Sequence, residues 1–152
     1  MAGRRNGRFR GGPPVLLSAV AALGLAACGG DEEASVDVTL QEFSVTPAEE
    51  SVPAGSITFQ VENTGPDDVH EFVVIKTDLD PADLPTDENG AVDEEGDGVE
   101  VLDEIEDVEV GDTRSVTVDL DAGSYALICN VWDEEEQEAH YKLGMRAPFT
   151  VT

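Results

Sequence analysis

From Val36 onward, apolar and polar residues alternate with a period of two, and this feature restricts the fold more than any other. Successive side chains of a β-strand point to opposite faces of a sheet, so the alternation is typical of strands with one buried face. We predict such strands in segments 36–41, 57–62, 70–76, 116–118, 125–129 and 148–152. No window of the sequence shows a sustained helical stripe.

Short strands separated by turn residues such as Asn63-Thr64-Gly65-Pro66 favour an all-β sandwich or barrel. Residues 36–152 are enough for one domain that buries its own core, so folding needs neither a disulfide nor a metal. The segment 78–110 breaks the pattern because acidic residues crowd it and apolar ones are few. We predict that it forms a long, solvated loop insertion.

This acidic segment also contains a formal match to a calcium-binding loop. The matching residues are Asp93, Glu95, Asp97, Gly98 and Glu104. Glu100 stands where such loops carry an apolar residue, and two upstream prolines leave no room for an entering helix. We interpret the match as a chance result of the acidic composition.

The first 27 residues have the layout of a secretory signal peptide, with a basic segment 1–12 followed by an apolar segment 15–27. The apolar segment is shorter than the roughly 20 residues that a membrane-spanning helix requires. Leu25-Ala26-Ala27-Cys28 resembles the bacterial lipobox, whose cysteine is diacylated and becomes the new N-terminus. The resemblance implies lipidation of Cys28, and two acyl chains on one residue are enough for stable membrane attachment.

We therefore divide the chain into a lipoprotein signal peptide (1–27), an acylated cysteine with an acidic tether (28–35) and one folded domain (36–152). The expected location is the cell membrane, with the domain lipid-anchored and facing outside the cytoplasm. The part that remains after cleavage carries all 34 acidic residues of the chain and only four of its eight basic ones. Such a surface repels nucleic acid and attracts basic proteins or metal ions, although acidity can also be an adaptation to a salty habitat.

With Cys28 acylated, the mature chain has few sulfur and imidazole side chains that could bind a metal, and all of them are of kinds that copper binds. They are His70, His140, Cys129 and, beyond the initiator, Met145. A copper site that exchanges electrons must tolerate both cuprous and cupric ions, which favours two imidazoles, one thiolate and a weak thioether. Cys129 ends one predicted strand, and His140 and Met145 lie just before the last one.

At these residues the sequence resembles the cupredoxin family. Asn-Thr-Gly at 63–65, leading to His-Glu-Phe-Val-Val at 70–74, is similar to the family's first-histidine region. A cysteine followed by His-x4-Met before the last strand is similar to its ligand loop, although the ten-residue spacer after Cys129 is longer than in plastocyanin-like members. The resemblance covers 36–152 apart from the acidic insertion and implies a Greek-key β-sandwich with one type 1 copper ion. The implied ligands are His70, Cys129 and His140, with Met145 as the axial ligand.

Many members of the family have an asparagine directly after the first histidine, where this chain has Glu71. The asparagine side chain helps to lock the copper loop, so that latch is missing here. The backbone N–H of Glu71 is still expected to donate a hydrogen bond to the Cys129 sulfur.

The resemblance implies electron transfer, with the copper alternating between Cu(I) and Cu(II) and no substrate chemistry of its own. We expect no enzyme, because both histidines are committed to the metal and no Ser/His/Asp set remains. Two alternatives stay open: copper storage or delivery with the same ligands, and a metal-free interaction domain. An electron carrier needs a redox partner protein, and the acidity favours a partner with a basic docking surface. We expect the protein to be a monomer.

Overall fold

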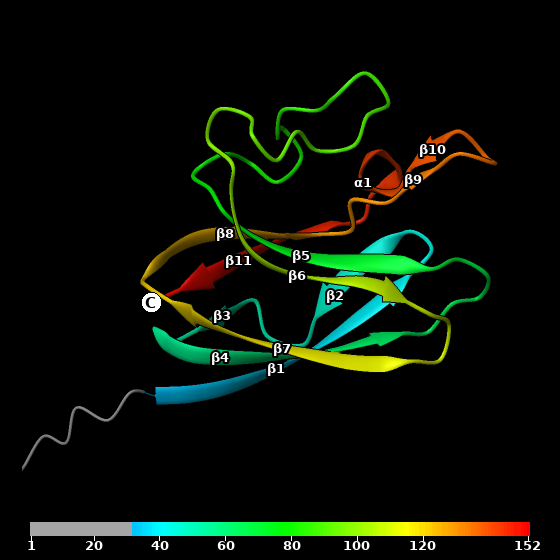
Figure 1. Ribbon diagram of the computed structural model, residues 1–152. Coiled ribbons are helices and arrows are strands. Elements are labelled where there is room, and N and C mark those ends of the chain that lie inside the picture. The colour runs from blue at the N-terminus through cyan, green and yellow to red at the C-terminus, as the bar shows by residue number, and fades with distance from the viewer. Residues whose placement is uncertain (1–31) are drawn as a thin grey trace, which may run out of the picture.

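The structure, a computed structural model, describes residues 32–152, which form two β-sheets packed face to face (Figure 1). The four-stranded sheet has the order β2-β1-β4-β7, and the five-stranded sheet has the order β3-β11-β8-β5-β6. The prediction of an all-β sandwich is confirmed. The signal peptide and the lipidation of Cys28 fall outside the described residues.

The first sheet contains β1 (Glu32–Gln41), β2 (Ser44–Pro47), β4 (Gly55–Asn63) and β7 (Thr113–Leu120). The second sheet contains β3 (Ser51–Val52), β5 (His70–Lys76), β6 (Glu100–Val108), β8 (Gly123–Ile128) and β11 (Arg146–Val151). A small hairpin of β9 (Trp132–Asp133) and β10 (Glu138–Ala139) and the short helix α1 (His140–Leu143) lie at one end of the sandwich. No helix among the described residues is long and apolar enough to cross a membrane.

The main core lies between the two sheets and is built from the apolar half of each alternating strand. From Val36 on, the alternating apolar residues of β1 and β4 are buried: Val36, Val38, Leu40, Ile57, Phe59 and Val61. Phe59 bridges the sheets, since its ring centroid lies 5.4 Å from both Phe72 of β5 and Phe149 of β11. Removing such a ring from a core typically costs about 3–5 kcal/mol. The period-two pattern therefore identified the buried face correctly.

The domain begins earlier than the sequence pattern indicates. Residues 32–35, which we expected to belong to the tether, form the first part of β1 and pair with β4 in parallel register from Glu32 opposite Gly55. Pairing with a neighbouring strand satisfies backbone N–H and C=O groups whatever the side chains are. Ala34, the apolar residue of this segment, packs partly buried against the main core. The tether expected over 28–35 therefore overlaps the first strand at residues 32–35.

The expectation of one loop over 78–110 was also wrong for residues 100–108, which form β6 at the edge of the five-stranded sheet. The pairing of β6 with β5 has two register shifts, between His70 and Phe72 and between Val74 and Ile75. Because of the first of these shifts, the buried residues of β6, Ile105 and Val108, are three positions apart instead of two. Acidic side chains are well tolerated on an edge strand because they discourage pairing with another chain.

Residues 77–99, the rest of the predicted insertion, are irregular but lie over the outer face of the five-stranded sheet (Figure 1). Leu84 and Val92 are each only 4% exposed and belong to a second apolar cluster. The other buried members of that cluster are Val73, Ile75, Ala126, Ile128 and Tyr141. The loop is therefore a cover with its own small core, which corrects the expectation of a solvated insertion.

Candidate metal centre

Four residues predicted from the sequence as copper ligands lie at the same end of the sandwich. His70 is the first residue of β5, and Cys129 directly follows the last residue of β8. Because these neighbouring strands are antiparallel, the start of one lies beside the end of the other. His140 opens α1, and Met145 directly precedes β11, whose first residue pairs with the last residue of β8.

Three side chains converge on one point. The Nδ1 atoms of His70 and His140 are 3.2 Å apart, and the Cys129 Sγ lies 3.9 Å from the first and 3.6 Å from the second. These distances allow a point about 2.1 Å from all three atoms, which matches metal-to-ligand bond lengths of roughly 2.0–2.3 Å for nitrogen and sulfur. Among the described residues this is the one group of His, Cys, Asp or Glu side chains placed to hold a metal ion.

The centre is closed to solvent. The exposed fractions are 0% for His70, Cys129 and Met145 and 2% for His140. The backbone N–H of Cys129 donates to the carbonyl of Met145 at 3.1 Å, and the N–H of Met145 donates to the carbonyl of His140 at 3.1 Å. The methionine is thus tied by its backbone to two of the converging residues.

The protonation states of the three converging groups suit a soft metal ion. Burial raises the pKa of the Cys129 thiol to about 12, so without a metal the sulfur is protonated. Burial lowers the pKa of both His70 and His140 from 6.5, so both rings are neutral at pH 7. Neutral imidazole is the form that binds metals, and a coordinated thiol loses its proton. The donor set therefore fits a single type 1 copper ion, with two imidazoles, one thiolate and a thioether nearby.

The backbone N–H of Glu71 donates to the Cys129 sulfur at 3.3 Å, as the sequence predicted. Hydrogen bonds to a ligating sulfur tune the metal and orient the ligand. The Glu71 side chain itself lies among acidic neighbours. Burial, together with the charges of Glu104, Glu94 and Glu106, raises the pKa of its carboxyl to about 7.

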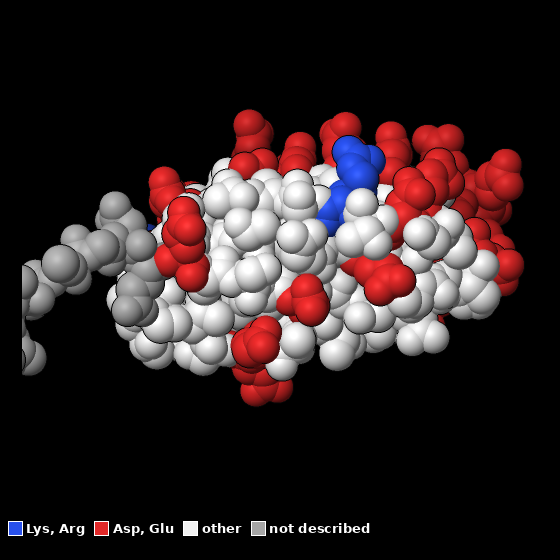
Figure 2. Space-filling model, turned by 90° about the horizontal axis from the view of Figure 1, so that it is seen from below, with Lys and Arg blue, Asp and Glu red and all other residues white. Residues whose placement is uncertain are grey.

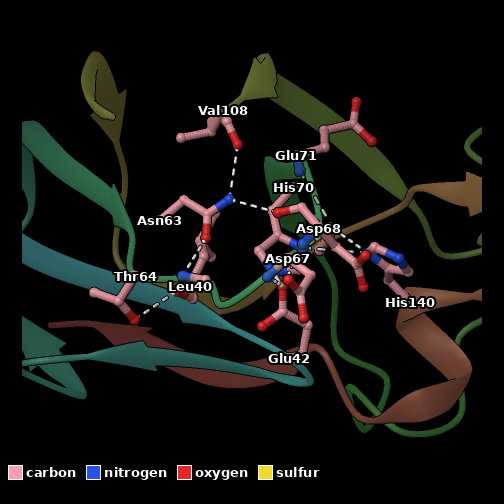
Figure 3. A network of polar contacts seen from close by, with 12 residues as sticks. Leu40, Glu42, Asn63, Thr64, Asp67, Asp68, His70, Glu71, Val108 and His140 are labelled. Carbon is pink, nitrogen blue, oxygen red and sulfur yellow. Dashed lines mark hydrogen bonds and ion pairs between the residues drawn. The ribbon is translucent and has the colours of Figure 1, made fainter. Parts of the chain in front are cut away.

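A buried asparagine holds the loop that leads to His70. Asn63 at the end of β4 is 0% exposed, and its Nδ2 donates to the carbonyls of Asp68 and Val108, each at 2.8 Å (Figure 3). Its Oδ1 accepts the N–H of Gly65 at 2.8 Å. The loop before the first histidine is therefore held by an asparagine seven positions upstream of it. The sequence analysis placed Asn63 in a turn and in the region that resembles the family's first-histidine segment, but it did not predict these three hydrogen bonds.

The loop 77–99 is fastened to both segments that carry the later ligands. Asn130, next to Cys129, accepts the N–H of Val92 at 2.6 Å and donates to its carbonyl at 3.1 Å. Tyr141, next to His140, donates its hydroxyl to the Pro81 carbonyl at 2.8 Å and accepts the N–H of Leu84 at 3.1 Å. Sequence reasoning missed both contacts, because nothing in the spacing indicates that the loop folds back onto the sheet.

The long spacer between Cys129 and His140 is filled by the hairpin β9–β10. Its tip is an acidic turn in which the Oδ1 of Asp133 accepts the N–H groups of Glu135 at 2.7 Å and Glu136 at 3.0 Å. The N–H of His140 donates to the carbonyl of Val131 at 3.0 Å, which closes the base of the hairpin. The spacer is therefore an ordered projection that leaves the ligands in place.

Comparisons with known proteins identify the fold. No family model matches the sequence, and no curated protein matches it. Auracyanin from Roseiflexus castenholzii is similar in structure, with a TM-score of 0.53 and 20% identity over 81% of this chain and 99% of that one. Auracyanin A from Chloroflexus aurantiacus, a "blue" copper protein, gives a TM-score of 0.53 and 16% identity over 80% and 100% of the two chains.

Rusticyanin from Thiobacillus ferrooxidans gives a TM-score of 0.53 and 14% identity, covering 81% of this chain and 79% of its own. Identities this low establish the fold. Residues 32–152 have the same fold as these blue copper proteins, a cupredoxin-like sandwich, and the His-Cys-His cluster of this chain lies at one end of it.

Proposed function

We propose that this protein is an electron carrier that holds one type 1 copper ion through His70, Cys129 and His140, with Met145 as the axial ligand. The observation that carries the proposal is the buried convergence of two imidazole Nδ1 atoms and one thiol within 4.8 Å of one another in a cupredoxin domain. A thiolate and a thioether favour cuprous ion, whereas imidazoles suit the cupric state as well, so the set tolerates one-electron cycling.

Hydrogen bonds of the surrounding backbone fix the positions of these ligands. Backbone hydrogen bonds tie Met145 to Cys129 and His140, and the N–H of Glu71 is aimed at the sulfur. Ligands fixed in this way keep their positions when the charge of the centre changes, which favours electron exchange. No substrate pocket or catalytic group of this chain takes part in the proposal.

The burial of the ligands supports electron transfer over copper delivery. An ion held by residues that are 0–2% exposed can leave only when the segment that carries His140 and Met145 opens. Fast transfer of copper to an acceptor protein, with slow reduction and oxidation, would favour delivery. Reversible one-electron cycling with slow copper loss would favour the electron carrier.

We also propose that the domain is lipid-anchored through Cys28 at the outer face of the cell membrane. The described chain enters the domain at the first residue of β1, and β1 ends beside Glu42, whose carboxylate lies 3.6 Å from His70. Ten residues of strand place these two ends about 30 Å apart. An anchor before β1 would therefore leave the metal end facing away from the membrane. Replacing Cys28 with Ser should release the domain or leave its precursor uncleaved, and unchanged membrane retention would contradict lipidation.

The redox partner proposed here has a basic docking surface. Figure 2 shows the outward face of the four-stranded sheet, where acidic side chains gather along one edge and at the end opposite the grey chain. In Figure 1 that end carries β9, β10 and α1, and the exposed residues Glu134, Glu135 and Glu136 lie there. A basic partner would be drawn to the end that holds the metal ligands.

The proposed function is tested by loading the purified chain with copper and recording its absorption and electron paramagnetic resonance spectra. An electron carrier of this kind gives an intense thiolate-to-copper charge-transfer band at one copper per chain. A metal-free interaction domain would take up no stoichiometric copper.

A further inference from the structure

Glu42, directly after β1, reaches the side of His70 that faces away from the other metal donors. Its Oε1 lies 3.6 Å from the Nε2 of His70, and the side chains are 11% and 0% exposed. Among the described residues, Glu42 Oε2 and His70 Nε2 are the buried side-chain polar atoms without a hydrogen-bond partner. Leaving buried polar groups unpaired costs about 1–3 kcal/mol each, so this placement calls for a functional reason.

The Glu42 carboxylate is held in place by the loop that leads to the first histidine. Its Oε1 accepts the backbone N–H of Asp68 at 2.6 Å and that of Asp67 at 3.1 Å (Figure 3). Those residues lie two and three positions before His70. The carboxylate, the loop and the imidazole therefore form one unit, which Asn63 fastens from the other side through the carbonyl of Asp68.

We propose that Glu42 is a positioning residue for the metal centre, whose carboxylate keeps the proton of the His70 ring on Nε2 and the Nδ1 lone pair directed at Cys129 and His140. A carboxylate oxygen only accepts hydrogen bonds, so the opposite tautomer would set a nitrogen lone pair against it. A carboxylate behind a ligating histidine fixes the tautomer and raises the basicity of the ligand. This role of Glu42 rests on the proposed function only for the identity of the metal, which is copper.

The test compares Glu42→Gln with the unaltered chain. Glutamine keeps the length of the side chain and an oxygen that accepts the N–H groups of Asp67 and Asp68, but it removes the charge. The tautomer of His70 is read in the metal-free protein by nitrogen-15 NMR of labelled histidine. We expect Nε2–H in the unaltered chain and at least a tenfold rise of the Nδ1–H population in Glu42→Gln. The dissociation constant for copper should rise about tenfold to a hundredfold.

Glu62→Gln is the matched control, because Glu62 is an exposed residue of β4 and its loss removes the same charge without touching His70. It should leave the tautomer and the copper affinity unchanged. The proposal is overturned if His70 of the unaltered chain carries its proton on Nδ1. It is also overturned if Glu42→Gln lowers only the unfolding midpoint, as a merely structural clamp would. The tautomer of His70 is measured in the metal-free protein and does not depend on copper binding. If the chain bound no copper, the proposed function would be contradicted, but the NMR result would still decide whether Glu42 sets the tautomer.

Discussion

Cys129 and Met145 are joined by a backbone hydrogen bond, with the N–H of the cysteine donating to the carbonyl of the methionine at 3.1 Å. They occupy the positions just beyond the last pair of the β8–β11 ladder, Ile128 opposite Arg146. The register of two strands therefore places these two residues side by side, and both are 0% exposed.

Met145→Leu should keep the copper and raise its reduction potential. The leucine matches the methionine in volume, so we expect a stability loss below about 1.5 kcal/mol. Removing the weak axial thioether destabilises the cupric form, since the axial ligand tunes the potential of such centres. Protein-film voltammetry measures the change, and Leu143→Met, at a side chain that is 41% exposed, is the control. Loss of copper or an unchanged potential would argue against an axial role.

Tyr141→Phe should loosen the cover formed by residues 77–99 and speed the loss of copper. The hydroxyl it removes donates to Pro81 and accepts from Leu84, so unfolding should become easier by about 1–3 kcal/mol. Tyr125→Phe is a matched control, because that hydroxyl donates to the carbonyl of Asp121 at 2.7 Å on another part of the domain. Chemical denaturation and copper release to a chelator measure the two effects. Equal release rates in both variants would show that the cover does not support the ligands.

Copper binding at pH 8 should release one proton for each ion bound. Burial raises the pKa of Cys129 to about 12, so the thiol enters the reaction protonated and must lose its proton on ligation. The lowered pKa of each histidine leaves both rings neutral at this pH, and the Glu71 carboxyl, with its pKa of about 7, is already ionised. Affinity should therefore rise about tenfold for each pH unit above 8 until the thiol ionises. Calorimetry in buffers of different ionisation enthalpy counts the protons, and a count of zero would exclude thiolate ligation.

Neutralising the hairpin tip, by changing Asp133 to Asn and Glu134, Glu135 and Glu136 to Gln, should alter two quantities together. The potential should rise, because negative charge near the centre favours the cupric state. Association with a cationic, cytochrome-like acceptor should slow toward the roughly 10⁶ M⁻¹s⁻¹ of uncharged docking and become less sensitive to salt. Stopped-flow mixing over a range of ionic strength measures the rate. If neither quantity changes, the acidity is a habitat adaptation and the docking proposal fails.

The sequence predicted the strands in which apolar and polar residues alternate regularly. It also predicted the four candidate ligands, because histidine, cysteine and methionine are so rare in the chain. It could not predict β6, because the register shift opposite His70 and Phe72 places the buried residues Ile105 and Val108 three positions apart instead of two. Nor could it predict the first residues of β1, where Ala34 alone offers an apolar side chain and the pairing relies mainly on backbone groups.

The contacts that hold the candidate metal centre in place could not be predicted from the sequence either. Glu42 and Asn130 contact His70 and Val92, which lie 28 and 38 positions away in the sequence, and a single acidic or amide side chain carries no signal of so distant a partner. The four donors, in contrast, could be recognised one by one from their chemistry. Lipidation of Cys28 and the location of the protein stay predictions, since the described residues begin at 32.

The most direct test of the account is the absorption spectrum of the copper-loaded chain beside that of Cys129→Ser. Serine keeps the size of the side chain and removes the thiolate, which is the source of the charge-transfer band. We predict an intense band at one copper per chain for the unaltered protein and its complete loss in Cys129→Ser. A variant that kept the blue colour, or an unaltered chain that bound copper without this band, would contradict a type 1 centre at His70, Cys129 and His140.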